Sequence, residues 1–278
     1  MAVRDALDTA RYYFKQFTKN SSMSGILYLV PNTLGTVEPG AEGADDATHR
    51  LDFIIPREAQ SIAARLDYFV VENAKSTRAF LKLLGTRQPL ARPIQEIAMA
   101  ELNVNTDAAA LPALLAPLLQ GRDGGLISEA GVPAVADPGA NLVRLAHQHG
   151  IRVRPLVGPS SLLLAVMASG LNGQSFAFNG YLPTDAAART KRIRQLEERS
   201  RTEHQTQLLI ETPYRNAAML EALASSCAPG TLICVATDLS LPGEAIRTQS
   251  ATQWKAALAS GKAPDFHKKP TVFLLLAQ

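Results

Sequence analysis

The sequence predicts an α/β protein made of two α/β domains. In its first half, short apolar strands alternate with amphipathic helices in the order βαβαβαβαβ, and this order demands a parallel sheet covered by helices on both faces. Beyond about Pro159 the pattern changes, because two strand-like runs are separated by only a short turn. We therefore expect a five-stranded, mainly parallel sheet in the first domain and a mixed sheet in the second.

The first domain is expected over residues 25–158, after an N-terminal extension of residues 1–24 to which we give no function. Its first strand is the buried run 25–30, followed by a turn at 31–35. Residues 36–51 are acidic and unpatterned, which predicts a mobile loop. A helix over residues 106–121 is expected to be capped by Thr106. The other strands are expected at 67–73, 94–102, 124–127 and 151–157, and the other helices at 56–66, 74–85 and 138–149.

The second domain is expected over residues 159–278. Ser160 or Ser161 can cap a helix that ends at Gly170. Residues 185–201 form a very charged helix that we expect to face solvent. The remaining strands are expected at 176–182, 205–211, 232–237, 245–248 and 271–276, with a further helix opening at 213–215.

Residues 124–139 organise the expected site. This stretch begins as an apolar strand and then breaks into Gly, Pro and small residues, which let backbone N–H groups approach a ligand closely. Asp137 is a good N-cap, and Pro138 suits the first helical position. The next strand ends in a similar turn at 158–161 that opens a helix. In an open parallel sheet, the carboxyl edge is where ligands bind.

Composition limits the class of protein. Lys plus Arg number 28 against 25 Asp plus Glu, which gives a net charge of +3. This charge permits an RNA partner without arguing for one. No apolar run approaches the roughly 18 residues of a membrane span. Cys227 and Cys234 lack the number and spacing of a zinc site, so we expect no metal and a reduced, cytoplasmic setting.

Polar residues gather where predicted strands end. Each has a structural explanation: the serines are simple N-caps, Asp137 is more readily structural, and the glutamates can be solvated strand ends. Their shared position at the carboxyl edge of the sheet favours a role in binding or catalysis over a purely structural one, because a cleft is expected there. These residues are Glu72, Asn73, Glu101, Asn103, Ser128, Glu129, Ser160, Ser161, Glu211 and Thr212.

Several common motifs are missing. The sequence has no G-x-G-x-x-G followed by an acid and no Walker lysine motif, which argues against a dinucleotide or P-loop site. Ser160 has no nucleophile elbow around it. His147 and His149 lie two residues apart on a predicted helix, so they point in different directions and are expected at the surface.

The segments L-I-S-E-A-G-V-P at 126–133, D-P-G at 137–139 and V-G-P-S-S at 157–161 resemble the tetrapyrrole-methylase superfamily of S-adenosylmethionine-dependent methyltransferases. The branch that they resemble contains the ribosomal-RNA small-subunit cytidine 2′-O-methyltransferases. Further support comes from F-N-G-Y-L-P at 178–183 and E-T-P-Y-R at 211–215. The resemblance runs from about residue 25 to the C-terminus.

This resemblance implies two α/β domains, S-adenosyl-L-methionine folded into the cleft between them, and a homodimer. It implies contacts of the methyl donor with the first loop and the 128–135 loop, and contacts of the adenosine end with the second domain. The cofactor-binding residues carried over by motif are Pro31, Ser128, Glu129, Ala130, Gly131, Val132, Pro133, Val135, Ser160, Ser161, Glu211, Thr212, Pro270 and Thr271.

The loops on the acceptor side depart from the RNA enzymes of that branch. The first loop reads P-N-T-L-G where they read like T-P-I-G-N-L, and their A-E-D-T-R becomes V-E-N-A-K at 71–75. Their H-N-E segment becomes E-L-N at 101–103. An alcohol acceptor needs help to lose its proton, and Glu72, Glu101 and Glu129 are the candidate general bases.

Three functions follow from the resemblance. The first is methylation of RNA, of the ribosomal 2′-O-ribose type. The second is methylation of a tetrapyrrole or another small molecule, which needs a broader apolar cleft and less basic assistance. The third is a donor-binding protein without catalysis, because fold-level similarity cannot choose the substrate.

Overall fold

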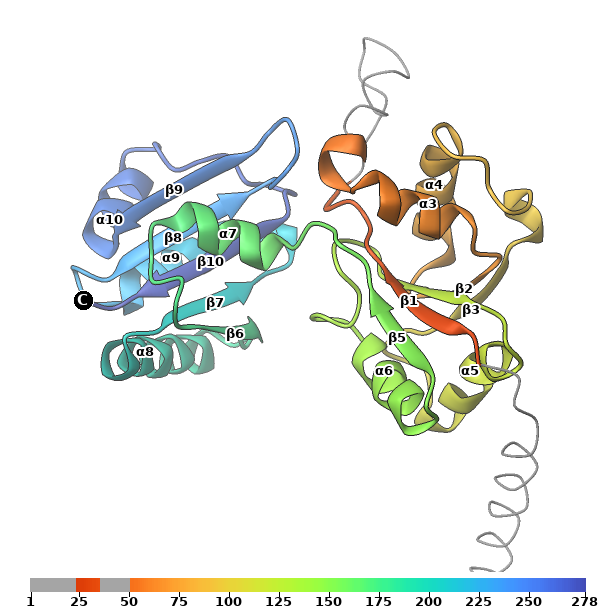
Figure 1. The fold of residues 1–278 in the computed structure, drawn as a ribbon. Coiled ribbons are helices and arrows are strands. Elements are labelled where there is room, and N and C mark those ends of the chain that lie inside the picture. Colours follow the sequence, from red (N-terminus) through yellow and green to blue (C-terminus); the bar gives the residue numbers. More distant parts are fainter. Residues whose placement is uncertain (1–23, 36–50) are drawn as a thin grey trace, which may run out of the picture.

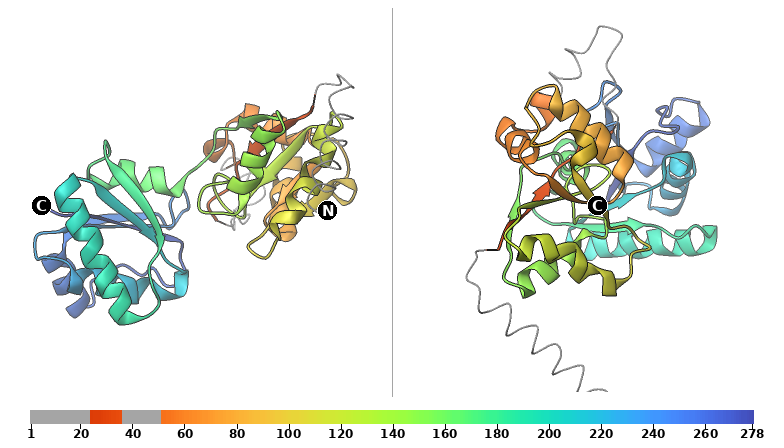
Figure 2. Two further views of the ribbon diagram at one scale, coloured as in Figure 1. Left: turned by 90° about the horizontal axis from the view of Figure 1, so that it is seen from below. Right: turned by 90° about the vertical axis from the view of Figure 1, so that its right-hand side faces the viewer.

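Two five-stranded sheets form the framework of the protein (Figure 1). The computed structural model describes residues 24–35 and 51–278. The predicted extension up to residue 23 and the predicted loop over residues 36–50 lie outside the described residues. Each sheet belongs to its own lobe, and the left view of Figure 2 shows the lobes side by side, joined by an extended stretch of chain.

The first sheet has the strand order β3-β2-β4-β1-β5, and every pair in it is parallel. The prediction of a parallel five-stranded sheet is therefore confirmed. All five strands end at the same edge, which brings the loops after them together. The strands are β1 Ile26–Val30, β2 Tyr68–Val71, β3 Ala98–Glu101, β4 Gly124–Ile127 and β5 Arg152–Pro155.

Helices cover both faces of this sheet. α3 (Arg57–Ala64) and α4 (Ala74–Gly85) lie on one face, and α5 (Leu111–Leu119) and α6 (Gly139–Gln148) lie on the other (Figure 1). Each face has its own buried apolar cluster. This arrangement explains why the central strands are apolar on both faces, since the residues of β2 and β4 are all buried.

Two details of the prediction are wrong. The helix expected over residues 106–121 is shorter, and the Thr106 hydroxyl accepts a bond from Asn103 N instead of capping it. Asp107 caps a short 3₁₀ turn, Ala108–Ala110, through Ala109 N, and α5 follows directly. The strand expected from residue 94 begins at Ala98, because Ile94–Glu96 forms a 3₁₀ turn.

The second sheet has the order β6-β7-β10-β8-β9. β6 and β7 are parallel and the other pairs are antiparallel, so the predicted mixed sheet is confirmed. Its strands are β6 Phe176–Tyr181, β7 Thr206–Ile210, β8 Leu232–Thr237, β9 Ala245–Ser250 and β10 Thr271–Leu276. Its helices are α7 Ser161–Ser169 on one face and α8 Ala186–Glu203, α9 Asn216–Ser226 and α10 Ala251–Ala259 on the other, and a 3₁₀ turn at Pro213–Arg215 precedes α9.

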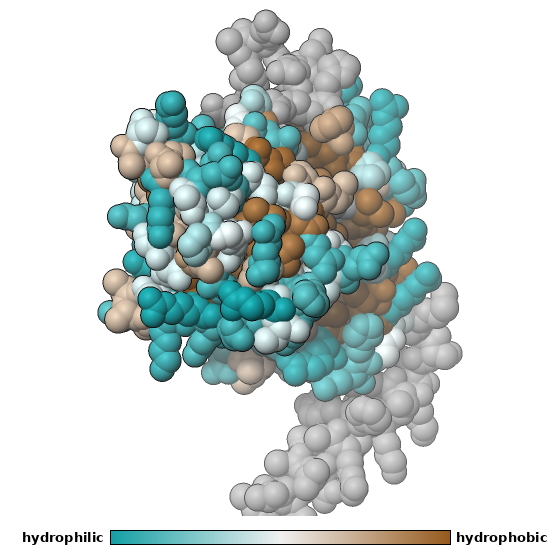
Figure 3. All heavy atoms as spheres, turned by 90° about the vertical axis from the view of Figure 1, so that its left-hand side faces the viewer, coloured by the Kyte–Doolittle hydropathy of each residue, from teal (hydrophilic) through white to brown (hydrophobic). Residues whose placement is uncertain are grey.

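The charged helix α8 lies as predicted on the outside of the second lobe. It buries Ile193, Leu196, Glu197 and Ser200, and most of its other side chains are exposed. Figure 3, which faces this lobe, shows a hydrophilic band along the lower edge where Figure 1 places α8. Its Arg199 and Arg201 pair with glutamates on the same helix.

The chain passes between the lobes after β5, through residues 156–160. A Cβ atom on Gly158 would lie 2.1 Å from Pro31 Cβ, so this backbone passes against the first loop where only a glycine fits. The predicted domain boundary at residues 158 and 159 falls in this stretch and stays a prediction.

Replacing Gly158 with alanine is expected to push the connection and the first loop apart. Overpacking of this kind costs about 1–3 kcal/mol, and urea unfolding would measure the loss. Gly173→Ala is the matched control, because its Cβ would meet only Val166 Cγ1 at an ordinary 3.5 Å. Equal stabilities of the two variants would contradict the close contact.

Candidate functional site

A cavity of about 430 Å³ lies between the carboxyl edge of the first sheet and the second sheet. Its size is that of a pocket for a small molecule or cofactor. The loop after β4 forms one wall, and α7, β6, β8 and β10 supply side chains to the other. The cavity therefore exists only because the two lobes meet.

Asn32 holds the loop after β4 in place. Its amide Nδ2 donates to Ser128 O at 3.1 Å and to Glu129 O at 3.0 Å, and its backbone N donates to Gly131 O at 2.8 Å. The chain leaves β1 toward β2 and leaves β4 toward β5, so these two neighbours form the topological switch point of the sheet. Asn32 is buried and joins the two loops at that point.

Asp137 holds the other end of the same loop. Its carboxylate accepts bonds from Ala134 N at 2.8 Å and from Gly139 N at 2.8 Å. Ala134 and Ala136 have φ of 66° and 65°, which an L-residue adopts only when its surroundings require it. Asp137 thus shapes the loop as well as the helix start, and Pro138, not Asp137, occupies the N-cap position of α6.

A small polar cluster joins the loops after β2 and β4. Asn73 Nδ2 donates to Glu129 Oε1 at 2.6 Å, and Glu72 Oε2 accepts from Glu129 N at 2.9 Å. The Asn73 side-chain oxygen also caps α4 by accepting from Lys75 N. Glu129 lines the cavity, so Asn73 orients a carboxylate at its wall.

Two carboxyl groups of this region, Glu72 and Asp137, have a pKa raised above the usual value. Burial is the main cause that raises the pKa of Glu72, opposed by the bond from Glu129 N, and the charges of Asp137 and Glu129 raise it further. Burial likewise raises the pKa of Asp137, against its bonds from Gly139 and Ala134. The carboxylates of Glu72 and Asp137 thus lie near that of Glu129, which lines the cavity.

The second lobe supplies a helix start and a buried acid. Ser160 caps α7 through Leu163 N, as predicted, and Ser160 and Ser161 line the cavity. Glu211 is 5% exposed, and its Oε1 accepts from Arg215 Nη2 at 2.6 Å and from Thr212 N at 2.7 Å. Since both bonds go to Oε1, no described residue bonds Oε2.

The structure brings most of the predicted cofactor-binding residues to the lining of one cavity. Those that line the cavity are Glu129, Ala130, Gly131, Val132, Val135, Ser160, Ser161, Glu211, Pro270 and Thr271. The others lie beside it: Pro31 against Gly158, Ser128 buried with its hydroxyl on Ala130 O, Pro133 buried, and Thr212 exposed next to Glu211. Of the predicted bases, Glu129 lines the cavity, and Glu72 accepts a hydrogen bond from the backbone N of Glu129. Glu101 is exposed at the end of β3.

Some residues of the site were not singled out from the sequence. Asn32 directly follows the buried strand β1, and that position is the signal that identifies it. Asn73 was predicted as a polar strand end but without its role in orienting Glu129. Phe178 and the 60% exposed Tyr181 line the cavity from β6, within a segment used only for the family resemblance. The apolar lining by Leu34, Ala136, Leu162, Ile210, Pro213, Ala236, Leu239 and Val272 left no sequence signal distinct from core packing.

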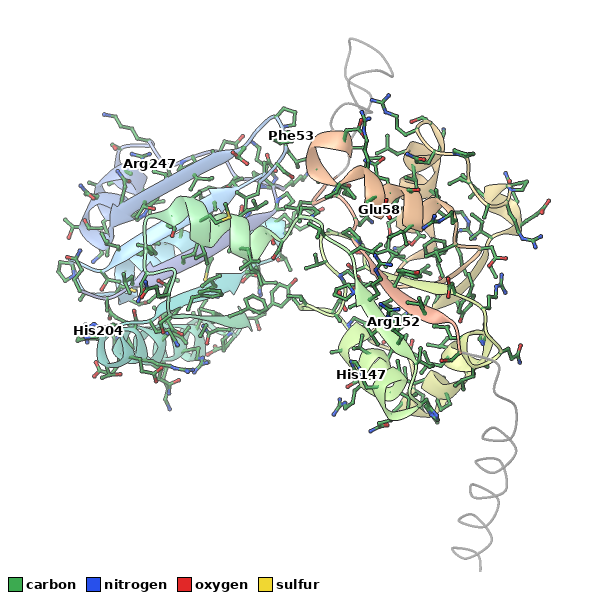
Figure 4. All side chains as sticks on the ribbon, in the orientation of Figure 1. Phe53, Glu58, His147, Arg152, His204 and Arg247 are labelled. Atoms are coloured by element: carbon green, nitrogen blue, oxygen red, sulfur yellow. The ribbon has the colours of Figure 1, made fainter. Side chains whose placement is uncertain are left out.

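Other reactive side chains lie away from the cavity wall. His147 and His149 are exposed, as predicted, and Figure 4 shows His147 on α6. Burial raises the pKa of the Cys227 thiol to about 12, so it is not a nucleophile. Within residues 24–35 and 51–278, no three His, Cys, Asp or Glu side chains gather to hold a metal ion. Among the helices of these ranges, none combines the length and hydropathy needed to cross a membrane.

Comparison with known proteins identifies the family. Residues 54–254 match the family model of tetrapyrrole (corrin/porphyrin) methylases, which covers more than half of the chain. The chain belongs to the tetrapyrrole methylase family. The resemblance predicted from the motifs is confirmed, and a tetrapyrrole methylase family member with these relatives is a methyltransferase.

Relatives and solved structures agree with this family. Ribosomal RNA small subunit methyltransferase I of Xylella fastidiosa is 30% identical over 220 residues, covering 79% of this chain and 74% of the relative. The protein of that name from Escherichia coli O157:H7 is 28% identical over 232 residues, covering 84% and 71%. The crystal structure of the methyltransferase CobJ has a TM-score of 0.56 at 18% identity, covers 91% of this chain and 95% of its own, and shows that this tetrapyrrole methylase shares its fold.

Replacing Glu72 with glutamine is expected to raise the free energy of unfolding at pH 7. The pKa of Glu72 is higher in the folded than in the unfolded protein, so its contribution to stability is present below the unfolded pKa and lost as pH rises through the folded value. The gain from Glu72→Gln should therefore shrink as pH falls below the usual pKa of glutamate. Urea unfolding of both proteins at pH 7 and pH 4 measures this difference, and a pH-independent difference would contradict it.

Proposed function

We propose that this protein transfers a methyl group from S-adenosyl-L-methionine to RNA, at a ribose 2′-hydroxyl of the small ribosomal subunit. The observation that carries the proposal is the two-walled cavity at the switch point of the first sheet. The family supports a methyl donor, and the names of the relatives support ribosomal RNA as the acceptor.

The cavity suits a methyl donor that carries both positive and negative groups. S-adenosyl-L-methionine supplies an activated methyl group on a positively charged sulfur, together with an ammonium, a carboxylate and an adenosine. Glu129 and Glu211 present carboxylates at the wall, and the N-terminus of α7 at Ser160 and Ser161 favours an anionic group. The apolar lining and Phe178 suit the adenine ring.

Among the predicted bases, Glu129 is best placed to accept the proton of an acceptor hydroxyl. It lines the cavity, and the amide of Asn73 fixes its carboxylate. Glu72 holds the backbone of the same residue, which makes it a positioning residue. Correct positioning of the acceptor is worth about 7–11 kcal/mol in favourable systems, and a general base adds roughly 10²–10⁴-fold.

A tetrapyrrole or another small molecule is the second candidate acceptor, supported by the apolar lining and by Tyr181 at 60% exposure. A donor-binding protein without catalysis is the third. Mapping of methyl groups on RNA from cells with and without this gene separates the first from the others. Labelled donor incubated with purified protein and either RNA or tetrapyrrole separates the last two.

Glu129→Gln is expected to lower kcat for RNA methylation by roughly 10²–10⁴-fold, because the amide cannot accept the proton. Glu101→Gln, at the exposed end of β3, is the matched control and should leave kcat unchanged. Single-turnover methylation of small-subunit ribosomal RNA measures both. Unchanged turnover in both variants would show that the base assignment is wrong.

We also propose that the protein is a homodimer and works in the cytoplasm. α7 is apolar on nearly all sides: it buries Ala165 and Val166 against the second sheet and leaves Leu163 53% and Met167 79% exposed. Val157, just before this helix, is 74% exposed. An exposed apolar row of this kind is typical of an interface between copies.

Met167→Glu is expected to weaken dimer association at least about tenfold, or about 1.4 kcal/mol, because the carboxylate would be buried without a partner. Val104→Glu, at an 86% exposed apolar residue beyond β3, is the control and should leave the assembly intact. Light scattering over a concentration series measures the molar mass. A mass unaffected by Met167→Glu would rule out this face.

A further inference from the structure

One exposed face of α4 carries three cations. Lys75, Arg78 and Lys82 are spaced three and four residues apart, so they share one side of the helix. All three are exposed, and α4 contains no Asp or Glu. Within the described ranges they form no ion pair, whereas Arg57 and Arg87 on the same lobe pair with Asp52.

Two features of this arrangement work against the stability of the helix, although Lys82 lies in the last turn, where the dipole favours a cation. Lys75 lies in the first turn, where the helix dipole disfavours a cation. The neighbours at three and four residues repel one another, since like charges at this spacing are destabilising. A local arrangement that opposes folding without a compensating contact is expected at functional sites. An anionic ligand would remove both penalties.

The row begins at the rim of the cavity. Asn73 caps the N-terminus of α4, its amide donates to Glu129 Oε1 at 2.6 Å, and Glu129 lines the cavity. From Lys75 to Lys82 the helix advances by roughly 10 Å. Figure 1 shows α4 over one face of the first sheet, with its length free of the second lobe. A ligand along this row can therefore reach the acceptor side of the site.

We propose that Lys75, Arg78 and Lys82 form a docking surface for the phosphate backbone of the acceptor RNA. The proposal rests on the proposed function and assigns the route by which the strand reaches Glu129. The strand is single, because an acceptor ribose must come to the rim of a small cavity. Three cations in a row match successive phosphates, and their contacts release counterions.

The test compares the triple variant K75Q/R78Q/K82Q with wild type in binding an unmodified small-subunit ribosomal RNA transcript at several salt concentrations. Each phosphate contact to a single strand contributes about 0.7 to the salt slope, so the slope should fall by about 2 and affinity by on the order of 100-fold at 0.1 M salt. The charge-preserving variant K75R/R78K/K82R should retain both.

A second triple variant, R152Q/K255Q/K262Q, removes the same charge elsewhere. Arg152 begins β5 at the amino edge (Figure 4), and the other two residues lie in the second lobe on or just after α10. The variant R152Q/K255Q/K262Q should bind RNA with an affinity within about twofold of wild type. K75Q/R78Q/K82Q should also unfold at no lower temperature than wild type, because it loses repulsion within α4.

Two results would overturn the proposal. The first leaves the proposed function standing, and the second rejects the RNA acceptor as well. Equal salt slopes for wild type and K75Q/R78Q/K82Q, with both proteins methylating the RNA, reject the α4 surface and leave the proposed function standing. Wild-type protein that binds S-adenosyl-L-methionine by calorimetry but methylates no RNA rejects the RNA acceptor and the surface together.

Discussion

The site depends on a pair of hydrogen bonds from one buried amide. Asn32 spans the gap between the ends of β1 and β4 and bonds to the carbonyls of Ser128 and Glu129. Parallel neighbours at a switch point diverge, because their connections run to opposite sides of the sheet. Asn32 closes that gap, and Asp137 holds the far end of the loop, so the intervening backbone keeps a conformation that few residues adopt unaided.

The charge distribution follows from this framework. Glu72, Glu129 and Asp137 come together only because their loops leave the same edge of the sheet, and burial and mutual repulsion raise the pKa of Glu72. Asn73 offsets part of that repulsion by donating to Glu129. A cationic methyl donor suits such a rim, and the cations of α4 lie just beyond it. Acidic and basic surfaces thus adjoin where donor and acceptor would meet.

Local signals in the sequence were most reliable where one physical rule acts alone. The alternation of apolar strands and amphipathic helices predicted both sheets, and Ser160 caps α7 as its position suggests. Prediction failed where rules compete. Thr106 and Asp107 are both good caps, and the structure uses Asp107 for a 3₁₀ turn that the periodicity of the leucines does not reveal. A run such as 94–102 does not show where a turn gives way to a strand.

The sequence by itself determined the class of fold, the family motifs and the loop that would meet a ligand, because each depends on residues close together in the chain. Only the tertiary structure decided which polar residues share one cavity. It joined Glu129 to Asn73, 56 residues apart, brought Glu211 and Thr271 to the opposite wall, and left Glu101 at the exposed end of β3. The physical reason is that a cavity between two lobes depends on how their sheets pack together, and no local pattern of residues records that packing.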